Sequence, residues 1–76
     1  MRDELLKIIH RLSQADSAGE AKRDECCSQL GVDSVTCART FEALDKLGYL
    51  SSHVSIGTAG LSRSGRAAAE RLLRRP

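Results

Sequence analysis

The stretch GVDSVTCARTFEALDKLGYL, from Gly31 to Leu50, carries the start signal, the apolar period and the stop signal of one helix. Asp33 is a residue type that accepts hydrogen bonds from the free backbone N–H groups of a first helical turn. Gly48 suits the left-handed conformation in which many helices end. Between these two residues the apolar side chains recur at helical spacing, at Cys37, Phe41, Leu44 and Leu47. We therefore predict a helix over residues 33–47, with one face in the core and one face free.

The residues before this helix predict another one, over about residues 20–30. Its start is ambiguous and lies near Gly19 or nearer Arg23. Its core face would consist of Cys26, Cys27 and Leu30. Gly31 ends it, and a single residue separates that glycine from Asp33. Two helices joined by so short a turn must cross steeply, which predicts a helix-turn-helix.

Two further helices flank this pair. The first covers residues 2–13, where apolar residues follow a helical stripe at Leu5, Ile8, Ile9 and Leu12. The last covers residues 63–75, begins after a capping Ser62, and has a narrow apolar stripe at Ala68, Ala69, Leu72 and Leu73. The chain of 76 residues has room for one small domain, residues 1–76.

A β-hairpin is predicted between the last two helices, over residues 49–61. Apolar and polar residues alternate there, with Leu50, Ser52, Val54 and Ile56 on one side. Its tip lies either at residues 55–57 or at residues 57–60, and the sequence does not choose between the two registers. The fold class is thus mainly α with a small β-hairpin, an α+β arrangement.

Composition predicts a soluble, intracellular protein. No apolar run approaches the roughly 20 residues of a membrane span, and the N-terminus alternates charged and apolar residues, unlike a secretory signal. Three cysteines, two of them adjacent, are a poor start for a disulfide framework, so we expect Cys26, Cys27 and Cys37 to be reduced and buried. His10 and His53 complete no zinc-ligand spacing with them, and we expect no metal and no cofactor.

The positive charge of the chain is concentrated at its end. The formal net charge is +2, but residues 1–60 hold seven Lys and Arg against nine Asp and Glu. Residues 61–76 hold five Arg against Glu70 alone. Cations in the last turn of a helix suit its dipole, so we interpret Arg71, Arg74 and Arg75 as mainly structural.

The order helix, helix-turn-helix, hairpin and closing helix resembles the winged helix-turn-helix domains of bacterial and archaeal transcriptional regulators, over nearly the full chain. The segment ECCSQLGVDSVTCARTFEALDKLGYL is similar to that family's Glu-Leu-Ala, Leu-Gly-Val, recognition helix and Leu-Gly-Tyr-Leu pattern. The segment LSRSGRAAAERL resembles the Leu-Thr-x-x-Gly-Arg ending that follows the wing in regulators of the multiple-antibiotic-resistance and phenolic-acid-repressor types. The resemblance implies a DNA-binding transcriptional regulator of the nucleoid, with helix 33–47 in the major groove.

The same resemblance assigns residues to the DNA contact. On the recognition helix it implies Ser34, Val35, Thr36, Ala38, Arg39 and Thr40. Around the helix, the cationic candidates for the phosphate backbone are Lys22, Arg23, Arg63 and Arg66, with His53 on the wing when it is protonated. Family regulators often dimerise through their terminal helices, which implies a homodimer and a palindromic DNA site. The candidate residues for dimerisation are Leu6, Leu72 and Leu73.

A protein-binding function remains open beside the DNA-binding one. Winged helices also dock on other proteins, and small phage or mobile-element proteins often consist of one such module. The predicted wing has no Lys or Arg, and Glu42 and Asp45 add negative charge to the recognition helix. An enzyme is not expected, since the sequence has no Gly-rich phosphate loop and no recognisable nucleophile motif. His10 is expected to be an ordinary surface histidine.

Overall fold

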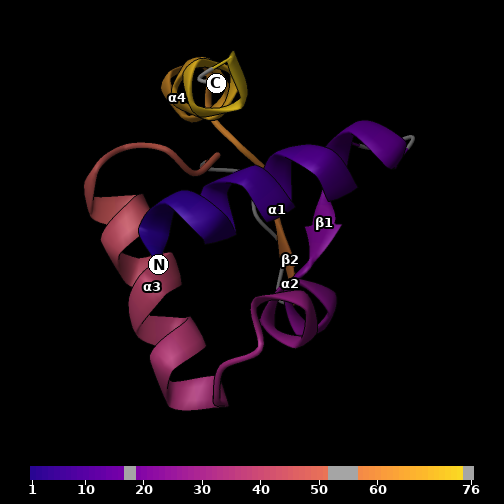
Figure 1. Cartoon of the computed structure of the whole chain (residues 1–76), viewed down its shortest axis with the longest axis vertical. Coiled ribbons are helices and arrows are strands. Elements are labelled where there is room, and N and C mark those ends of the chain that lie inside the picture. The colour runs from indigo at the N-terminus through magenta and orange to yellow at the C-terminus, as the bar shows by residue number, and fades with distance from the viewer. Residues whose placement is uncertain (17–18, 52–56, 75–76) are drawn as a thin grey trace.

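The computed structural model describes residues 1–16, 19–51 and 57–74, and Figure 1 shows their arrangement. In chain order the helices and strands are α1 (Arg2–Ala15), β1 (Ala21–Lys22), α2 (Arg23–Leu30), α3 (Ser34–Lys46), β2 (Thr58–Ala59) and α4 (Arg63–Arg74). The described part of the chain is therefore mainly helical, with one short antiparallel strand pair. This confirms the predicted α+β class.

The turn between α2 and α3 follows the sequence signals closely. Gly31 adopts a left-handed conformation, with φ of 75°, and its N–H donates to the Cys27 carbonyl at 3.1 Å. The Asp33 side chain accepts a hydrogen bond from the Thr36 N–H at 3.3 Å and so caps α3. The cap at Asp33 is confirmed, and the structure starts α2 at Arg23 rather than near Gly19.

The prediction of helix from about residue 20 is wrong for its first residues, because Ala21 and Lys22 form β1 instead. This strand pairs antiparallel with β2, with Ala21 opposite Ala59. The Arg23 N–H extends the pairing by donating to the Gly57 carbonyl at 2.9 Å. The strand partners of β1 lie 36 and 38 residues further along the chain, so no local sequence pattern predicts this strand.

The base of the predicted hairpin is present. Leu50 and Leu61 form an antiparallel bridge, and the Ser51 N–H donates to the Gly60 carbonyl at 2.8 Å. The predicted tip, including His53, Val54 and Ile56, lies outside the described residues.

Helix α1 forms the centre of the domain and packs against the three other helices. Figure 1 shows it crossing the middle of the molecule, with α4 above it and with α2 and the first turns of α3 below it. The core consists of fully or almost fully buried side chains: Leu5, Leu6, Ile9, Ala21, Cys26, Cys37, Phe41, Leu44, Ala59 and Ala69. One position of the apolar stripe predicted for residues 33–47 deviates, since Leu47 remains about half exposed.

A close contact fixes α4 to the end of α3. The Ser62 hydroxyl accepts from the Gly65 N–H at 3.1 Å, as expected for a cap, and donates to the Gly48 carbonyl at 2.6 Å. A Cβ added to Gly65 would lie 2.0 Å from the carbonyl oxygen of Tyr49. Gly65 therefore allows the α4 backbone to approach the chain that leaves α3.

The expectation of three reduced cysteines is wrong in this structure. Cys27 of α2 and Cys37 of α3 form a disulfide, with their Cα atoms 5.8 Å apart. The steep crossing of the two helices brings these residues together across the turn. Cys26 is free and fully buried, and burial together with the nearby Glu25 raises the pKa of its thiol to about 11.

Candidate nucleic-acid interface

The first half of α3 presents a contiguous exposed surface. Ser34, Val35, Ala38 and Arg39 are exposed, and Thr36 is half-buried. Positions 34, 35, 38 and 39 share one side of a helix, since residues three and four apart are neighbours. Val35 keeps 57% of its surface exposed, which is high for an aliphatic side chain. Five of the six residues assigned to the recognition helix therefore keep exposed surface on the first half of α3.

Thr40 is the exception, and its predicted exposure is wrong. Its relative exposure is 7%, and its hydroxyl donates to the Thr36 carbonyl at 2.8 Å. The same hydroxyl lies 3.5 Å from the sulfur of Met1. Thr40 follows Cys37 by three residues and so belongs to the buried stripe of the helix.

Lys22 and Arg23 lie at the junction of β1 and α2, and they differ in how freely their charged groups can contact a ligand. Lys22 is exposed. Arg23 is half-buried, its guanidinium lies over the Phe41 ring at 4.7 Å from the centroid, and its Nε is buried with no hydrogen-bond partner among the described residues. Lys22 is thus the freer cation of the two.

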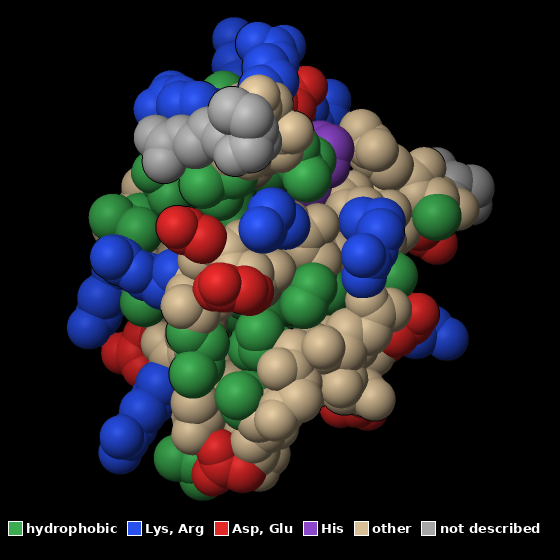
Figure 2. Space-filling model, viewed as in Figure 1, with side chains coloured by type: hydrophobic (Ala, Val, Ile, Leu, Met, Phe, Trp, Pro, Cys, Tyr) green, Lys and Arg blue, Asp and Glu red, His purple; other side chains and the backbone are tan. Residues whose placement is uncertain are grey.

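Mixed charges surround the exposed half of α3. The carboxylate of Asp33 lies at its start, and the hydrogen bond from Thr36 lowers the pKa of that carboxyl. Further along, Lys46 forms an ion pair with Glu42 at 3.4 Å, and Asp45 is exposed. Figure 2 shows blue and red side chains alternating along the side on which α3 lies. Arg39 is the only Lys or Arg between Asp33 and Thr40.

Arg63 and Arg66 do not lie beside this surface. Both are exposed and belong to the first turns of α4. In Figure 1, α4 occupies one end of the long axis of the molecule, whereas the α2–α3 turn and the start of α3 occupy the other end. His53 lies outside the described residues.

The candidate dimerisation residues are also separated by the structure. Leu6 is 2% exposed and belongs to the core, so its assignment to an outer surface is wrong. Leu72 is half-buried and packs against the core. Leu73 is 55% exposed.

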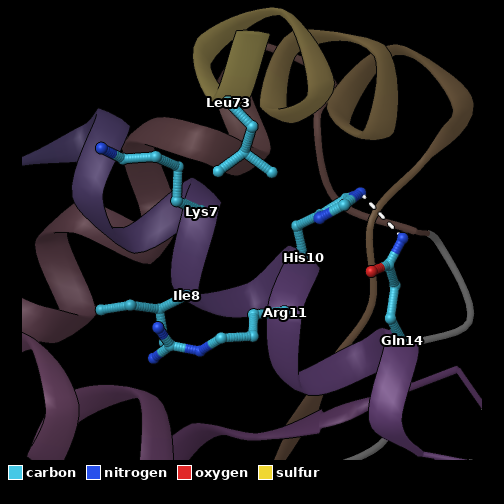
Figure 3. A pocket seen from close by; sticks show the side chains of 6 residues that line it. All are labelled: Lys7, Ile8, His10, Arg11, Gln14 and Leu73. Atoms are coloured by element: carbon cyan, nitrogen blue, oxygen red, sulfur yellow. Dashed lines mark hydrogen bonds between the residues drawn. The ribbon is translucent and has the colours of Figure 1, made fainter. Parts of the chain in front are cut away.

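Leu73 borders a surface hollow of about 390 Å³ between α1 and α4, shown in Figure 3. The other lining residues come from α1: Lys7, Ile8, His10, Arg11 and Gln14. His10 is 6% exposed, contrary to the expectation of a surface histidine, and its Nε2 lies 3.3 Å from the amide nitrogen of Gln14. The Arg11 guanidinium donates to the Gln29 side chain of α2. The hollow therefore combines aliphatic surface with two cationic side chains.

Within the described ranges, no three His, Cys, Asp or Glu side chains converge in a way that could hold a metal ion. Over the same residues, none of the helices combines the length and the apolar character that crossing a membrane requires. Comparisons of the chain with protein-family models, with curated proteins and with solved structures found no match.

Proposed function

We propose that this chain is a winged helix-turn-helix protein that binds double-stranded DNA through α3, and that it acts as a transcriptional regulator rather than as an enzyme. The observation that carries the proposal is the division of α3 into a buried stripe and an exposed first half. The exposed half is capped at Asp33, follows a tight turn, and stands at one end of the molecule. A helix presented in this way has the geometry needed to enter a major groove.

The exposed side chains have chemistry that suits base edges and phosphates. Arg39 could bond to guanine or to a phosphate. Ser34 and Thr36 carry hydroxyls that donate to phosphates or bases, and the methyl groups of Val35 and Ala38 match the thymine methyl. Lys22, exposed on β1 directly before α2, adds a second cation.

The charge distribution limits the affinity that one molecule can reach. Arg39 and Lys22 would neutralise about two phosphates, which corresponds to a salt slope of about −2 for a monomer. A homodimer would double these contacts and would match a palindromic site. We propose that the dimer forms through the α1–α4 side, because Leu73 is exposed beside a hollow there.

A salt series measured by fluorescence anisotropy tests DNA binding. The protein is titrated into random-sequence duplex DNA from low to physiological salt, and sedimentation at the same concentrations gives the oligomeric state. We expect Arg39→Ala to weaken binding by about tenfold and to reduce the salt slope by about one per protomer. Arg71→Ala is the matched control, because Arg71 is exposed on α4, at the end of the molecule opposite the start of α3. The DNA affinity of this variant should equal that of the unmodified protein. Absence of binding at low salt, from a protein with a normal helical circular dichroism spectrum, would contradict the proposal.

The second candidate is a docking module that uses the same helix against a protein. The observation that favours it is the mixed charge along α3, where the carboxylates of Asp33, Glu42 and Asp45 would repel a polyanionic ligand. The exposed Val35 also suits a protein interface. Capture of proteins from a cell lysate on the immobilised protein tests this candidate, with Val35→Arg as the comparison. A partner retained by the unmodified chain and lost with Val35→Arg would support docking, whereas equal retention would contradict it.

A further inference from the structure

The disulfide between Cys27 and Cys37 links the two helices of the predicted helix-turn-helix directly. Cys27 lies in α2 and Cys37 lies in α3, ten positions apart, and the turn at Gly31 and Asp33 lies between them. The Cα separation of 5.8 Å lies in the normal range for a bridge. The bond therefore restrains the position of α2 relative to α3.

The rest of the domain has its own means of holding together. Leu5 and Ile9 of α1 contribute to a core that also contains Phe41 and Leu44 of α3, independently of the bridge. Three cysteines allow only one intramolecular disulfide, whereas small domains that depend on disulfides carry several. The loop that this bond closes is short, and short loops give the smallest entropic stabilisation. The bond is thus positioned to adjust a local contact rather than to hold the whole fold.

The two bonded cysteines differ in exposure. Cys37 is 0% exposed, whereas Cys27 is half-buried and keeps part of its surface in solvent. The neighbouring Cys26 is fully buried, and its pKa of about 11 leaves it almost entirely protonated at neutral pH. Attack from solution is therefore directed to Cys27, and Cys26 does not compete as an internal nucleophile.

We propose that Cys27 and Cys37 form a reversible redox site that exchanges with small thiols of the glutathione class, and that its oxidation state sets how firmly the first half of α3 is held against α2. In reduction, a thiolate attacks the Cys27 sulfur, and Cys37 leaves as a thiolate that takes up a proton. A second small thiolate then attacks the mixed disulfide at its non-protein sulfur. This step releases the oxidised small disulfide, and Cys27 leaves as a thiolate that takes up a proton. Oxidation is the reverse exchange, with the small disulfide as the acceptor of two electrons.

A change in redox state would affect the exposed surface that carries Val35, Ala38 and Arg39. Cys37 is flanked by these residues, and in the oxidised form its side chain is tied to α2. In the reduced form that tie is absent, and the first turns of α3 rely on the Asp33 cap and on the packing of Cys37. This inference concerns the presentation of α3 and goes beyond the proposed function, since it holds for any ligand of that helix.

The first measurement is a thiol count on the full chain across glutathione buffers. The protein is equilibrated at stated ratios of reduced to oxidised glutathione, quenched with acid, alkylated in denaturant and weighed by mass spectrometry. We expect three alkylated thiols under reducing conditions and one under oxidising conditions, with a continuous transition between them. One thiol at every ratio would mean a permanent structural bond, and three at every ratio would mean that the bond does not form in solution. Either result would overturn the proposal.

The second measurement tests the effect on α3 by amide hydrogen exchange. We expect amides 36–39 to exchange several-fold faster in the reduced protein, while amides 66–72 of α4 keep their rates. Cys27→Ser should exchange at the reduced rate in both buffers, and Cys26→Ala should respond as the unmodified chain does. Equal α3 rates in the two redox states would overturn the coupling to α3. If either variant fails to fold, the comparison of α3 exchange rates in the oxidised and reduced unmodified protein is sufficient to test the coupling.

Discussion

The two halves of α3 differ in what holds them. The second half is fixed by the core, with Phe41 and Leu44 almost completely buried and the following Gly48 bonded to Ser62. The first half has its outer face in solvent and is held at its start by the Asp33 cap and from one side by Cys37. One helix can therefore stabilise the fold with one half and leave the outer face of its other half free to contact a ligand. Changes in the second half should therefore cost stability, and changes in the first half should affect binding.

Gly65→Ala should produce the largest loss of stability, because it acts where the second half of α3 leads into α4. The new Cβ would overlap the Tyr49 carbonyl oxygen at 2.0 Å, and both groups belong to the backbone. Relief requires α4 to move away from residues that also hold Ser62. We expect a loss of about 3 kcal/mol in the free energy of unfolding, measured by urea denaturation.

Ser64→Ala is the matched control for this prediction. Ser64 precedes Gly65 in α4 and is exposed, so the added helix propensity and the lost hydroxyl should leave stability within about 0.5 kcal/mol. Equal stabilities of the two variants would show that α4 does not approach the chain after α3 as closely as described.

The elements that the sequence predicted correctly are those with local signals. Asp33 and Gly48 fix the bounds of α3 to within one residue at each end, and Ser62 marks the start of α4. Strand β1 could not be predicted, since two residues carry no period and their partner at Thr58–Ala59 is distant in sequence. The disulfide depends on the crossing of α2 and α3. Adjacent cysteines differ by about 100° around a helix, and only the tertiary arrangement selects Cys27 over Cys26.

The site was predicted less well for related reasons. The sequence favours an outer surface for Leu6, because one apolar stripe already accounts for the core face of its helix. Helix α1 instead packs against three helices, so its buried face is wider than a single stripe. A polar residue such as Thr40 is expected on the exposed face, yet its hydroxyl donates to a carbonyl of its own helix and the side chain is buried. The charge of Arg23 makes it a candidate phosphate contact, but its packing over the Phe41 ring depends on the tertiary fold and has no local sequence signal.

Thr40→Val sharpens the boundary between the two halves of α3. The substitution keeps the shape of the side chain and removes the hydroxyl that donates to the Thr36 carbonyl. We expect a loss of about 1 kcal/mol in the free energy of unfolding and no change in DNA affinity. Ser34→Ala should do the opposite, with stability maintained and binding weakened. Thermal unfolding and anisotropy titration of both variants measure this, and a loss of DNA binding with Thr40→Val at full folding would place the boundary one turn further along.

The smallest expected effect concerns the charge of the Asp33 cap. It tests whether that charge stabilises the first half of α3. The hydrogen bond from Thr36 lowers the pKa of this carboxyl from its ordinary value of 3.8, so the folded protein favours the ionised form. The ionised cap therefore stabilises α3 above about pH 4, and its contribution is lost as the pH falls through the lowered pKa. Asp33→Asn keeps a side-chain acceptor for the helix but has no charge to interact with the helix dipole.

The thermal midpoints of the two proteins should therefore differ slightly at neutral pH, with the unmodified chain higher, and should converge as the pH falls through the lowered pKa of Asp33. The other carboxyl groups, including that of Glu4 whose pKa is lowered by its contact with the N-terminal ammonium, are common to both proteins and cancel in the difference. A midpoint difference that stays constant with pH would show that the charge of Asp33 does not hold the start of α3. The disulfide would then be left as the main restraint on the exposed half, and reduction should loosen that half more than the cap variant does.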